Sequence, residues 1–587
     1  MDEKTSGREP IQIIEIEQDF CTRTYGTAPC TAALGVGPQN KCFNTLATCQ
    51  DAPHFDPEIK VLRFSRPTSA RVPMVHSFPF LKSASTAPTI INPGGGKSGS
   101  SPLGQRAVLR VSMLDAPSTD SQVDKYLDER AYNSLARGTF WSKWLARNQF
   151  YRNRKIRVLD GYKGQALNAF MKREYIIDAI DGPNSRGDVT ITAKDVLVLA
   201  DDDKSQAPKP SKGELAEAIA TGTITRILIA GASLSDYPSA GTVRIGRELF
   251  KYTASSTELT NIKLTGLTRA SDRTIEAAHK IGDKVQECLR YTDIRCDEIV
   301  YELLTTYGNV PSSYINKPVW EAEAALWLNQ FEISAIITEP TGVKTLLAEI
   351  TEQCLFHIWW DERAQLIKLE ALKPPIYDSI PVITEAKNII ADSVTIKDDQ
   401  SRRVSQVWIS YGMRDPTDKA DDANNYDRAR VSANLDSELP IRYGESKIKA
   451  IYSRWLQTDA QVANVGTRLL NRFSKPPKVV KIELDAKDRN FWTGGIVDMS
   501  VGGVVDYTGL QVLTRYQITS AEETDAGSKI ELTLDQYEYQ AGKRYGRWMI
   551  DLAPVYTAAT PLEKELGFFW SDAAGKMSDG SNGYVWG

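Results

Sequence analysis

The sequence predicts an α+β protein that is mainly β, with two large β-domains, a small β-domain inserted between them and a few packing helices. Short alternating segments typical of half-buried strands recur in both halves of the chain. Segments with helical spacing are confined to the middle and to one stretch near residue 465. The 12 tryptophans and 24 tyrosines suit a β-rich protein with large interfaces.

Composition excludes several classes of protein. The chain is 41% hydrophobic and 25% charged, as ordinary globular proteins are. A net charge of -4 gives no general attraction to nucleic acid or anionic lipid. No segment is apolar for long enough to span a membrane, and the opening MDEKTSGREPIQ lacks the apolar core of a secretory signal. We therefore expect synthesis in a cytosol, where disulfides are disfavoured.

Residues 1–205 are expected to form the first large β-domain. Its predicted strands are residues 11–16, 60–64, 107–113, 174–180 and 188–199. Residues 137–160 mix aromatic and basic side chains, a combination that can bind single-stranded nucleic acid. Because the whole chain is not basic, we interpret this stretch as packed aromatics with solvated basic neighbours.

Residues 216–291 are expected to form the inserted small β-domain, with a strand at 224–229 and a hairpin that turns at Gly246. His279 lies in this segment without a nucleophile or a carboxylate pattern beside it. An isolated histidine seldom acts as a base without an orienting partner, so a structural role is expected.

Residues 292–375 are expected to be helical and connecting, with helices at 297–307 and 343–358. Cys354 and His357 fall within the second helix in an apolar run, which indicates core packing. The second large β-domain is predicted at 376–552. It contains a helix at 459–473 capped by Asp459, followed by four alternating strands at 479–484, 496–501, 510–519 and 529–537. Residues 553–587 are rich in Gly and Ser but end on aromatics, which suits a flexible docking tail.

Four of the seven cysteines lie in one segment, residues 20–55, separated by eight, eleven and six residues; they are Cys21, Cys30, Cys42 and Cys49. Such clustering indicates a metal or covalent crosslink. The spacing lacks the short Cys-x2–4-Cys unit usual for zinc. Two disulfides are a further alternative. Four converging thiolates can also hold a [4Fe–4S] cluster without such a unit.

The pattern FCTRTYGTAPC…KCFNTLATCQD resembles the cysteine segment of tail tip proteins of lambda-type siphophages. The resemblance implies a [4Fe–4S] cluster on Cys21, Cys30, Cys42 and Cys49. Residues 238–285, with GTVRIG, LTGLTR, AAH and GDKV in order, resemble an insertion domain common in phage tail and baseplate proteins.

The two large β-domains resemble those of the hub protein of contractile tails, whose two tube-forming, barrel-like domains per subunit assemble as a trimer. The resemblance implies a structural hub at the distal end of a phage tail, assembled in the host cytoplasm. It also implies contacts with the distal tail protein or tail tube and with baseplate, tail fibre and tape-measure proteins. DNA would pass through the ring without specific binding.

No catalytic motif is recognisable: H-E-x-x-H, G-x-S-x-G and the dinucleotide-binding glycine set are all missing. We therefore expect no enzymatic activity. The alternatives are an iron–sulfur redox protein, which would need a second cofactor site or a substrate pocket, and a tail-associated cell-wall hydrolase.

Overall fold

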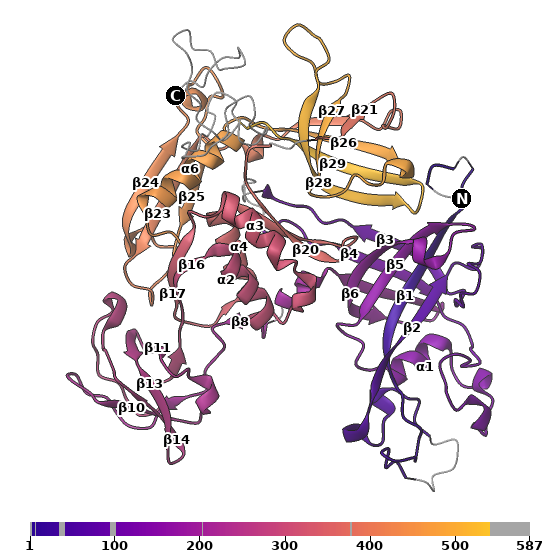
Figure 1. Ribbon diagram of the computed structural model, residues 1–587, viewed down its shortest axis with the longest axis horizontal. Helices are drawn as coiled ribbons and strands as arrows, with labels where there is room; N and C mark the ends of the chain where they lie inside the picture. Colours follow the sequence, from indigo (N-terminus) through magenta and orange to yellow (C-terminus); the bar gives the residue numbers. More distant parts are fainter. Residues whose placement is uncertain are drawn as a thin grey trace, which may run out of the picture.

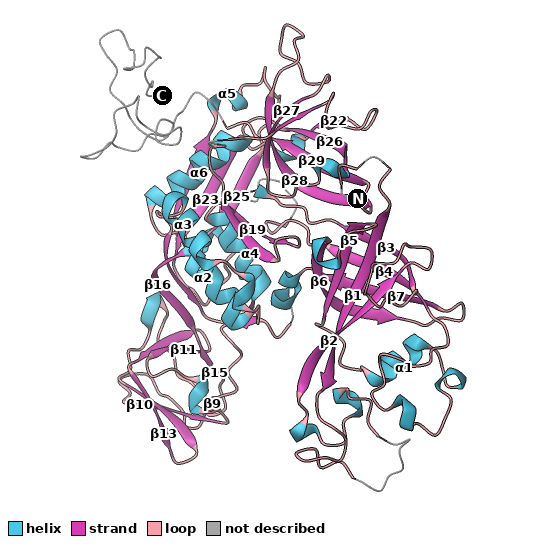
Figure 2. Cartoon of the chain, turned by 45° about the vertical axis from the view of Figure 1, so that its right-hand side comes forward, coloured by secondary structure: helices cyan, strands magenta, loops and turns pink. Residues whose placement is uncertain are grey.

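The computed structural model describes residues 3–5, 7–33, 41–93, 101–201, 203–375 and 379–539 (Figure 1). Strands dominate these residues and helices are few, which confirms the predicted mainly-β fold class (Figure 2). None of the helices in these ranges is long and apolar enough to cross a membrane. The predicted docking tail, residues 553–587, lies outside the described residues.

The first large sheet contains seven antiparallel strands in the order β2-β1-β5-β6-β7-β4-β3. They are β1 (Pro10–Cys21), β2 (Pro57–Ser65), β3 (Leu81–Ala87), β4 (Val108–Leu114), β5 (Lys155–Tyr162), β6 (Met171–Asp181) and β7 (Asp188–Lys194). Alternate side chains build a core against which α1 (Phe140–Arg147) packs Phe140, Trp141 and Trp144. The strand predicted at 188–199 is shorter, because Val196–Asp201 forms a 3-10 helix that joins the central core.

The inserted domain contains two small sheets, ordered β13-β14-β10-β9 and β12-β11-β15, around one core. Their strands are β9 (Glu214–Leu215), β10 (Arg226–Ala230), β11 (Gly241–Ile245), β12 (Glu248–Tyr252), β13 (Ala254–Glu258), β14 (Asn261–Thr265) and β15 (Val285–Glu287). Gly246, with φ +60°, makes the turn of the predicted hairpin. Figure 1 shows this domain beside β8 (Gln206–Ala207) and β16 (Leu289–Arg295), away from both large sheets.

The centre of the molecule is one apolar core shared by helices and short strands. Its first part comprises α2 (Cys296–Glu302), α3 (Lys317–Trp327), α4 (Val343–Gln353), β8 (Gln206–Ala207), β16 (Leu289–Arg295), β17 (Glu332–Ile337), β18 (Thr341–Gly342), β19 (Phe356–Asp361) and β20 (Leu366–Ala371). Its second part comprises β23 (Gln406–Met413), β24 (Tyr426–Ala433), α5 (Leu435–Glu438), β25 (Ile448–Tyr452) and α6 (Asp459–Phe473). The described part of the segment 376–552 is thus divided between this core and the last sheet.

Two details of the predicted helices are corrected. The helix predicted at 343–358 ends at Gln353, because Leu355 adopts a left-handed φ of 57° and β19 begins at Phe356. Cys354 and His357 therefore share no helix. The helix predicted at 459–473 has those bounds, but its cap is Thr458, whose side chain accepts a hydrogen bond from the Gln461 amide.

The second large sheet contains six strands in the order β21-β27-β28-β29-β26-β22. They are β21 (Val382–Thr384), β22 (Thr395–Asp398), β26 (Lys478–Asp485), β27 (Ile496–Ser500), β28 (Thr514–Asp525) and β29 (Lys529–Gln536). The four strands predicted in series are confirmed as β26 to β29, and their buried face has its own apolar core. Only β21 pairs in parallel, at one edge.

The two large sheets meet at the end of the β28–β29 hairpin. Arg173 of β6 pairs with Asp160 of β5 at 2.7 Å and lies 3.5 Å from Glu523 of β28; all three are buried. Beside them, the Tyr162 hydroxyl donates to the Gly527 carbonyl over 2.8 Å. Separating the sheets would leave buried charges without their partners, which costs free energy. These contacts therefore favour one arrangement of the two sheets.

Candidate metal centre

The four cysteines of the clustered segment line one pocket at the end of the first sheet. Cys21 is the last residue of β1, and Cys30, Cys42 and Cys49 follow in the long connection to β2. The cavity between them is small, about 10 Å³, and its wall includes Tyr25, Asp51 and His54. Residues up to 28 positions apart in the chain are therefore brought around one small space.

The end of β1 fixes the position of the Cys42 loop. The Cys21 amide donates to the Asn44 carbonyl over 2.7 Å, and the Asn44 side-chain amide donates to the Cys21 carbonyl over 3.1 Å. Asn44 has a left-handed φ of 59°, a conformation that asparagine tolerates well. Its backbone amide also hydrogen-bonds Cys42. The reciprocal pair therefore places the second half of the segment against the first.

Asp51 joins the residue that follows Cys30 to the part of the segment that follows Cys49. Its carboxylate accepts a hydrogen bond from the Thr31 amide at 2.6 Å and lies 2.9 Å from His54 Nδ1, and these contacts hold the pKa of Asp51 below its usual value. The Asp51 amide donates to Cys49 Sγ over 3.4 Å. Amide-to-sulfur hydrogen bonds of this kind stabilise thiolate ligands and tune the centres that they hold.

A buried ion pair supports the loop from outside the pocket. Arg130 and Asp124 pair at 2.8 Å with almost no exposed side-chain surface. The Arg130 guanidinium also donates to the carbonyls of Lys41, at 2.8 Å, and Cys42, at 3.1 Å. Phe43 completes the arrangement, because the Arg130 guanidinium lies 4.1 Å from the centre of its ring.

Burial makes two of the pocket thiols weaker acids. Desolvation, together with the charges of the neighbouring cysteines, raises the pKa of Cys42 and of Cys49. All seven cysteines are free thiols. A metal centre here would therefore release protons as it binds, because only thiolates are ligands.

The four thiols line one pocket, but they do not form a site for a single metal ion. Among the described residues, no three His, Cys, Asp or Glu side chains converge on a position that could hold one metal ion. The four cysteines instead line the wall of one pocket. Thiols are the donors of thiolate-held centres, so the chemistry of Cys21, Cys30, Cys42 and Cys49 fits such a centre, whereas their present spacing does not.

His279 has acidic partners that the sequence did not reveal. Its Nε2 lies 2.9 Å from the Glu248 carboxylate, and its Nδ1 lies 4.0 Å from Asp283. Glu248 is fully buried and also pairs with Arg269 at 2.9 Å. Glu248 begins β12, whereas His279 lies 31 residues later in the chain and pairs with Ile219, so the fold of the inserted domain brings the two side chains together. These contacts hold separate segments of the inserted domain together, which agrees with the structural role predicted for His279.

The aromatic and basic stretch at 137–160 also has a structural explanation. Trp141 and Trp144 are buried under the first sheet. Arg147 pairs with Asp120 at 2.8 Å, and Arg154 with Asp19 at 3.2 Å. The aromatics are packed as predicted, but Arg147 and Arg154 are largely buried ion-pair partners and not solvated side chains, because acidic residues distant in the sequence lie beside them.

No protein-family model matches this sequence, and no curated protein matches it. Solved structures do match it. A prophage tail protein of Listeria monocytogenes is 10% identical with a TM-score of 0.33, covering 78% of this chain and 88% of its own. A tail protein from Neisseria meningitidis is 12% identical with a TM-score of 0.34, covering 77% and 97%.

A third similar structure is an Escherichia coli type VI secretion component, described as similar to the T4 tail proteins gp27 and gp5. It is 7% identical with a TM-score of 0.33, covering 83% of this chain and 80% of its own. These three structures are phage tail and secretion-system proteins. Their low identities transfer no site residue to this chain.

Proposed function

We propose that this chain is a structural hub protein at the distal end of the tail of a siphovirus-type bacteriophage. Three copies form a ring that continues the tail tube, connects it to tip proteins and lines the DNA exit channel. The observation that carries the proposal is the meeting of Cys21, Cys30, Cys42 and Cys49 in one pocket. The spacing of these four residues is the feature that resembles tail tip proteins.

The buried contacts between the two large sheets support a role for this chain in the wall of a channel. The seven-stranded and six-stranded sheets are joined by the buried contacts of Arg173 and Tyr162. A subunit with two fixed sheets supplies two wall segments, so three subunits supply six, the number that a six-fold tail tube requires. Ring closure of this kind uses one interface repeated around the axis.

Charge is compatible with the passage of DNA. Each free Lys or Arg that contacts phosphate adds affinity and slows movement. The net charge is -4, and Arg147 and Arg154 of the most basic stretch are paired with carboxylates. Nucleic acid would therefore pass such a wall without specific binding.

The four pocket cysteines would hold a [4Fe–4S] cluster. Thiols are the donors that such clusters use, and the resemblance of the cysteine segment is the reason to prefer a cluster to zinc. When bound, it supplies a crosslink that ties the connection between β1 and β2 into one shape. The chain's own contribution is to position the thiols with Asn44, Asp51 and Arg130.

Two measurements test the proposal on the full chain purified without oxygen. Elemental analysis is expected to give four irons and four sulfides per chain. Native mass spectrometry is expected to show a particle of three 65.3 kDa chains. Zinc or two disulfides in place of iron would remove the cluster and leave the hub. A monomer at all concentrations would overturn the ring. Steady electron transfer to an acceptor would favour a redox protein instead.

A further inference from the structure

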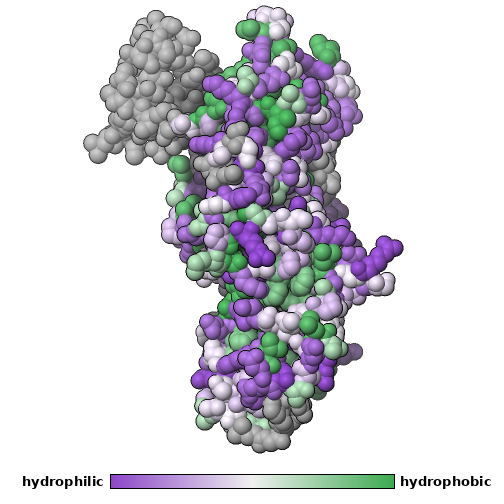
Figure 3. Space-filling view, turned by 90° about the vertical axis from the view of Figure 1, so that its right-hand side faces the viewer, coloured by the Kyte–Doolittle hydropathy of each residue, from purple (hydrophilic) through white to green (hydrophobic). Residues whose placement is uncertain are grey.

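Buried charged side chains gather where the two large sheets and the central hairpin of β19 and β20 meet. Charged side chains normally lie on the surface, and Figure 3 shows hydrophilic side chains along the full length of one face. Here, in contrast, four charged residues are between 0% and 8% exposed: Asp160 of β5, Arg173 of β6, Glu362 of the turn after β19 and Glu523 of β28. Arg363, beside Glu362, is partly buried. We call these five residues the junction.

One cation holds two carboxylates across the junction. Arg173 Nη2 lies 2.7 Å from Asp160 Oδ2 and 3.5 Å from Glu523 Oε2. The other carboxylate oxygen of Glu523 accepts a hydrogen bond from the Gly527 amide over 2.7 Å. Among the described residues, Arg173 Nε and Glu523 Oε2 are buried without a hydrogen-bond partner. Charge therefore holds the end of the β28–β29 hairpin against the first sheet, at a cost in unsatisfied polar atoms.

Glu362 adds a third carboxyl group beside this pair. Its backbone carbonyl accepts a hydrogen bond from the Glu174 amide over 3.1 Å, so the turn lies directly against β6. The groups that interact electrostatically with its carboxyl group come from β6 and from the residues next to it in the chain: Arg173, Tyr175, Asp361 and Arg363. When Glu362 is ionised, the three carboxylates of the junction face only two guanidinium groups.

The buried position makes Glu362 hold its proton more tightly than an exposed glutamate does. Desolvation raises the pKa of Glu362 to about 7, because the attraction of Arg173 and Arg363 offsets only part of the lost hydration. Desolvation and the charge of Asp160 also raise the pKa of Glu523. An exposed glutamate titrates near about pH 4.3, so above that pH the closed junction binds a proton that an opened junction releases. The stability of the closed junction is therefore complete in acid and is lost as the pH rises through about 7.

Other contacts limit how far the junction can open. The Ile91 amide donates to the Thr519 carbonyl over 3.0 Å, so β28 is already joined to the first large β-domain before it reaches the junction. The Arg363 guanidinium lies 3.2 Å from the centre of the Trp492 ring, which ties the β19–β20 turn to the loop between β26 and β27. Opening is therefore confined to the end of the β28–β29 hairpin, residues 523–529, and its immediate surroundings.

We infer that the junction is a proton-dependent latch between the two large sheets. When Glu362 carries a proton, the hairpin end at 523–529 is held against β5 and β6. When Glu362 gives its proton to water, the excess buried negative charge favours a form in which water enters the junction and the hairpin end moves away from β6. The latch works within one chain, so it goes beyond the trimeric hub proposed above and does not depend on it.

Hydrogen exchange of the full chain, measured by mass spectrometry, tests the latch. Protection factors are corrected for the intrinsic effect of pH on exchange and compared at about pH 5 and about pH 8. In the wild type, the protection of residues 523–529 should fall at least about tenfold at the higher pH. The protection of β7, inside the first sheet, should not change.

Two variants identify the group that carries the proton. Glu362→Gln keeps a neutral side chain of similar shape, so the protection of residues 523–529 should stay at its acid value at both pH values. Glu339→Gln is the matched control, because the Glu339 side chain is 70% exposed, and it should respond to pH as the wild type does. Equal protection of the wild type at both pH values overturns the latch, and this comparison needs no substitution. A pH response that survives in Glu362→Gln, or low protection of that variant at both pH values, overturns it as well.

Discussion

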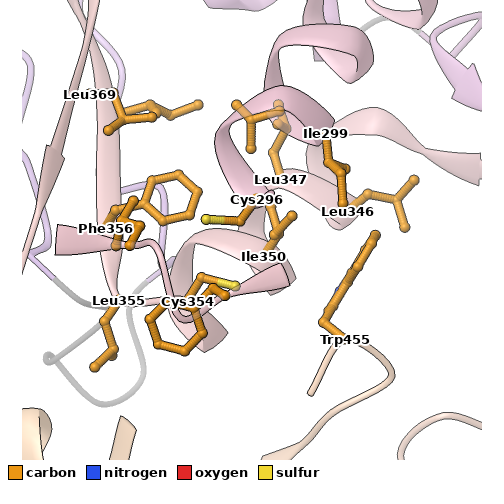
Figure 4. Close-up of a cluster of buried hydrophobic side chains, with 14 of the residues drawn as sticks. Cys296, Ile299, Leu346, Leu347, Ile350, Cys354, Leu355, Phe356, Leu369 and Trp455 are labelled. Carbon is orange, nitrogen blue, oxygen red and sulfur yellow. The ribbon is translucent and has the colours of Figure 1, made fainter. Parts of the chain in front are cut away.

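The clustered cysteines and the pair Cys296 and Cys354 place the same side chain in opposite surroundings. The cluster lies at the end of a sheet, in a pocket with amide donors and a carboxylate. Cys296 and Cys354 are fully buried among leucine, isoleucine and aromatic side chains (Figure 4). In the first environment the amides of Asn44 and Asp51 favour the thiolates of Cys42 and Cys49, whereas the second environment is apolar.

This difference shows what distinguishes a ligand from a packing residue. Burial raises the pKa of Cys354 well above the ordinary thiol value, and Cys296 beside it adds to the shift. Among the residues that the structure describes, no backbone amide donates to the sulfur of Cys296 or Cys354 as the Asp51 amide donates to Cys49. A buried thiol without polar partners behaves as a small hydrophobic side chain. Sequence clustering therefore separates the four pocket cysteines from Cys296 and Cys354, which fill core positions.

The largest expected effect comes from removing one sulfur of the pocket. Cys42→Ser is expected to lower the iron content at least tenfold, because a hydroxyl does not replace a thiolate as a soft ligand. Iron and sulfide analysis after anaerobic purification measures it. Cys288→Ala is the matched control, since Cys288 is buried in a different part of the chain. Equal losses in both variants would contradict the assignment of the pocket.

The support outside the pocket should have the next largest effect. Arg130→Met leaves Asp124 buried without its cation, which is expected to cost about 3–5 kcal/mol of unfolding free energy. It also removes the donors to the Lys41 and Cys42 carbonyls, so bound iron should fall as well. Urea unfolding and iron analysis measure both effects.

A double variant separates the charge effect from general damage. Asp124→Leu combined with Arg130→Met removes both charges and should unfold closer to the wild type than the single variant does. If the double variant is as unstable as Arg130→Met, the buried ion pair is not the cause of the loss.

The sequence was sufficient for the regular features. Strict alternation predicted β1, β4 and the series β26 to β29, and spacing alone singled out the four pocket cysteines. It was not sufficient where contacts between distant segments determine the local conformation. Leu355 ends α4 in a left-handed conformation imposed by core packing, and no local breaker residue marks it. Arg130 supports Cys42 from 88 positions away, so neither residue signals the other.

The smallest expected effect comes from the packing pair. Cys354→Ala removes one buried sulfur from a tightly filled core, which is expected to cost about 1–2 kcal/mol of unfolding free energy. Iron content and trimer mass should stay at the wild-type values, because the nearest neighbours of Cys354 belong to α4, α2 and β19 and not to the metal pocket. Urea unfolding measures the first effect, and elemental analysis with native mass spectrometry measures the second. A loss of iron in this variant would mean that the core pair and the pocket are coupled, and would remove the distinction between packing and ligand cysteines.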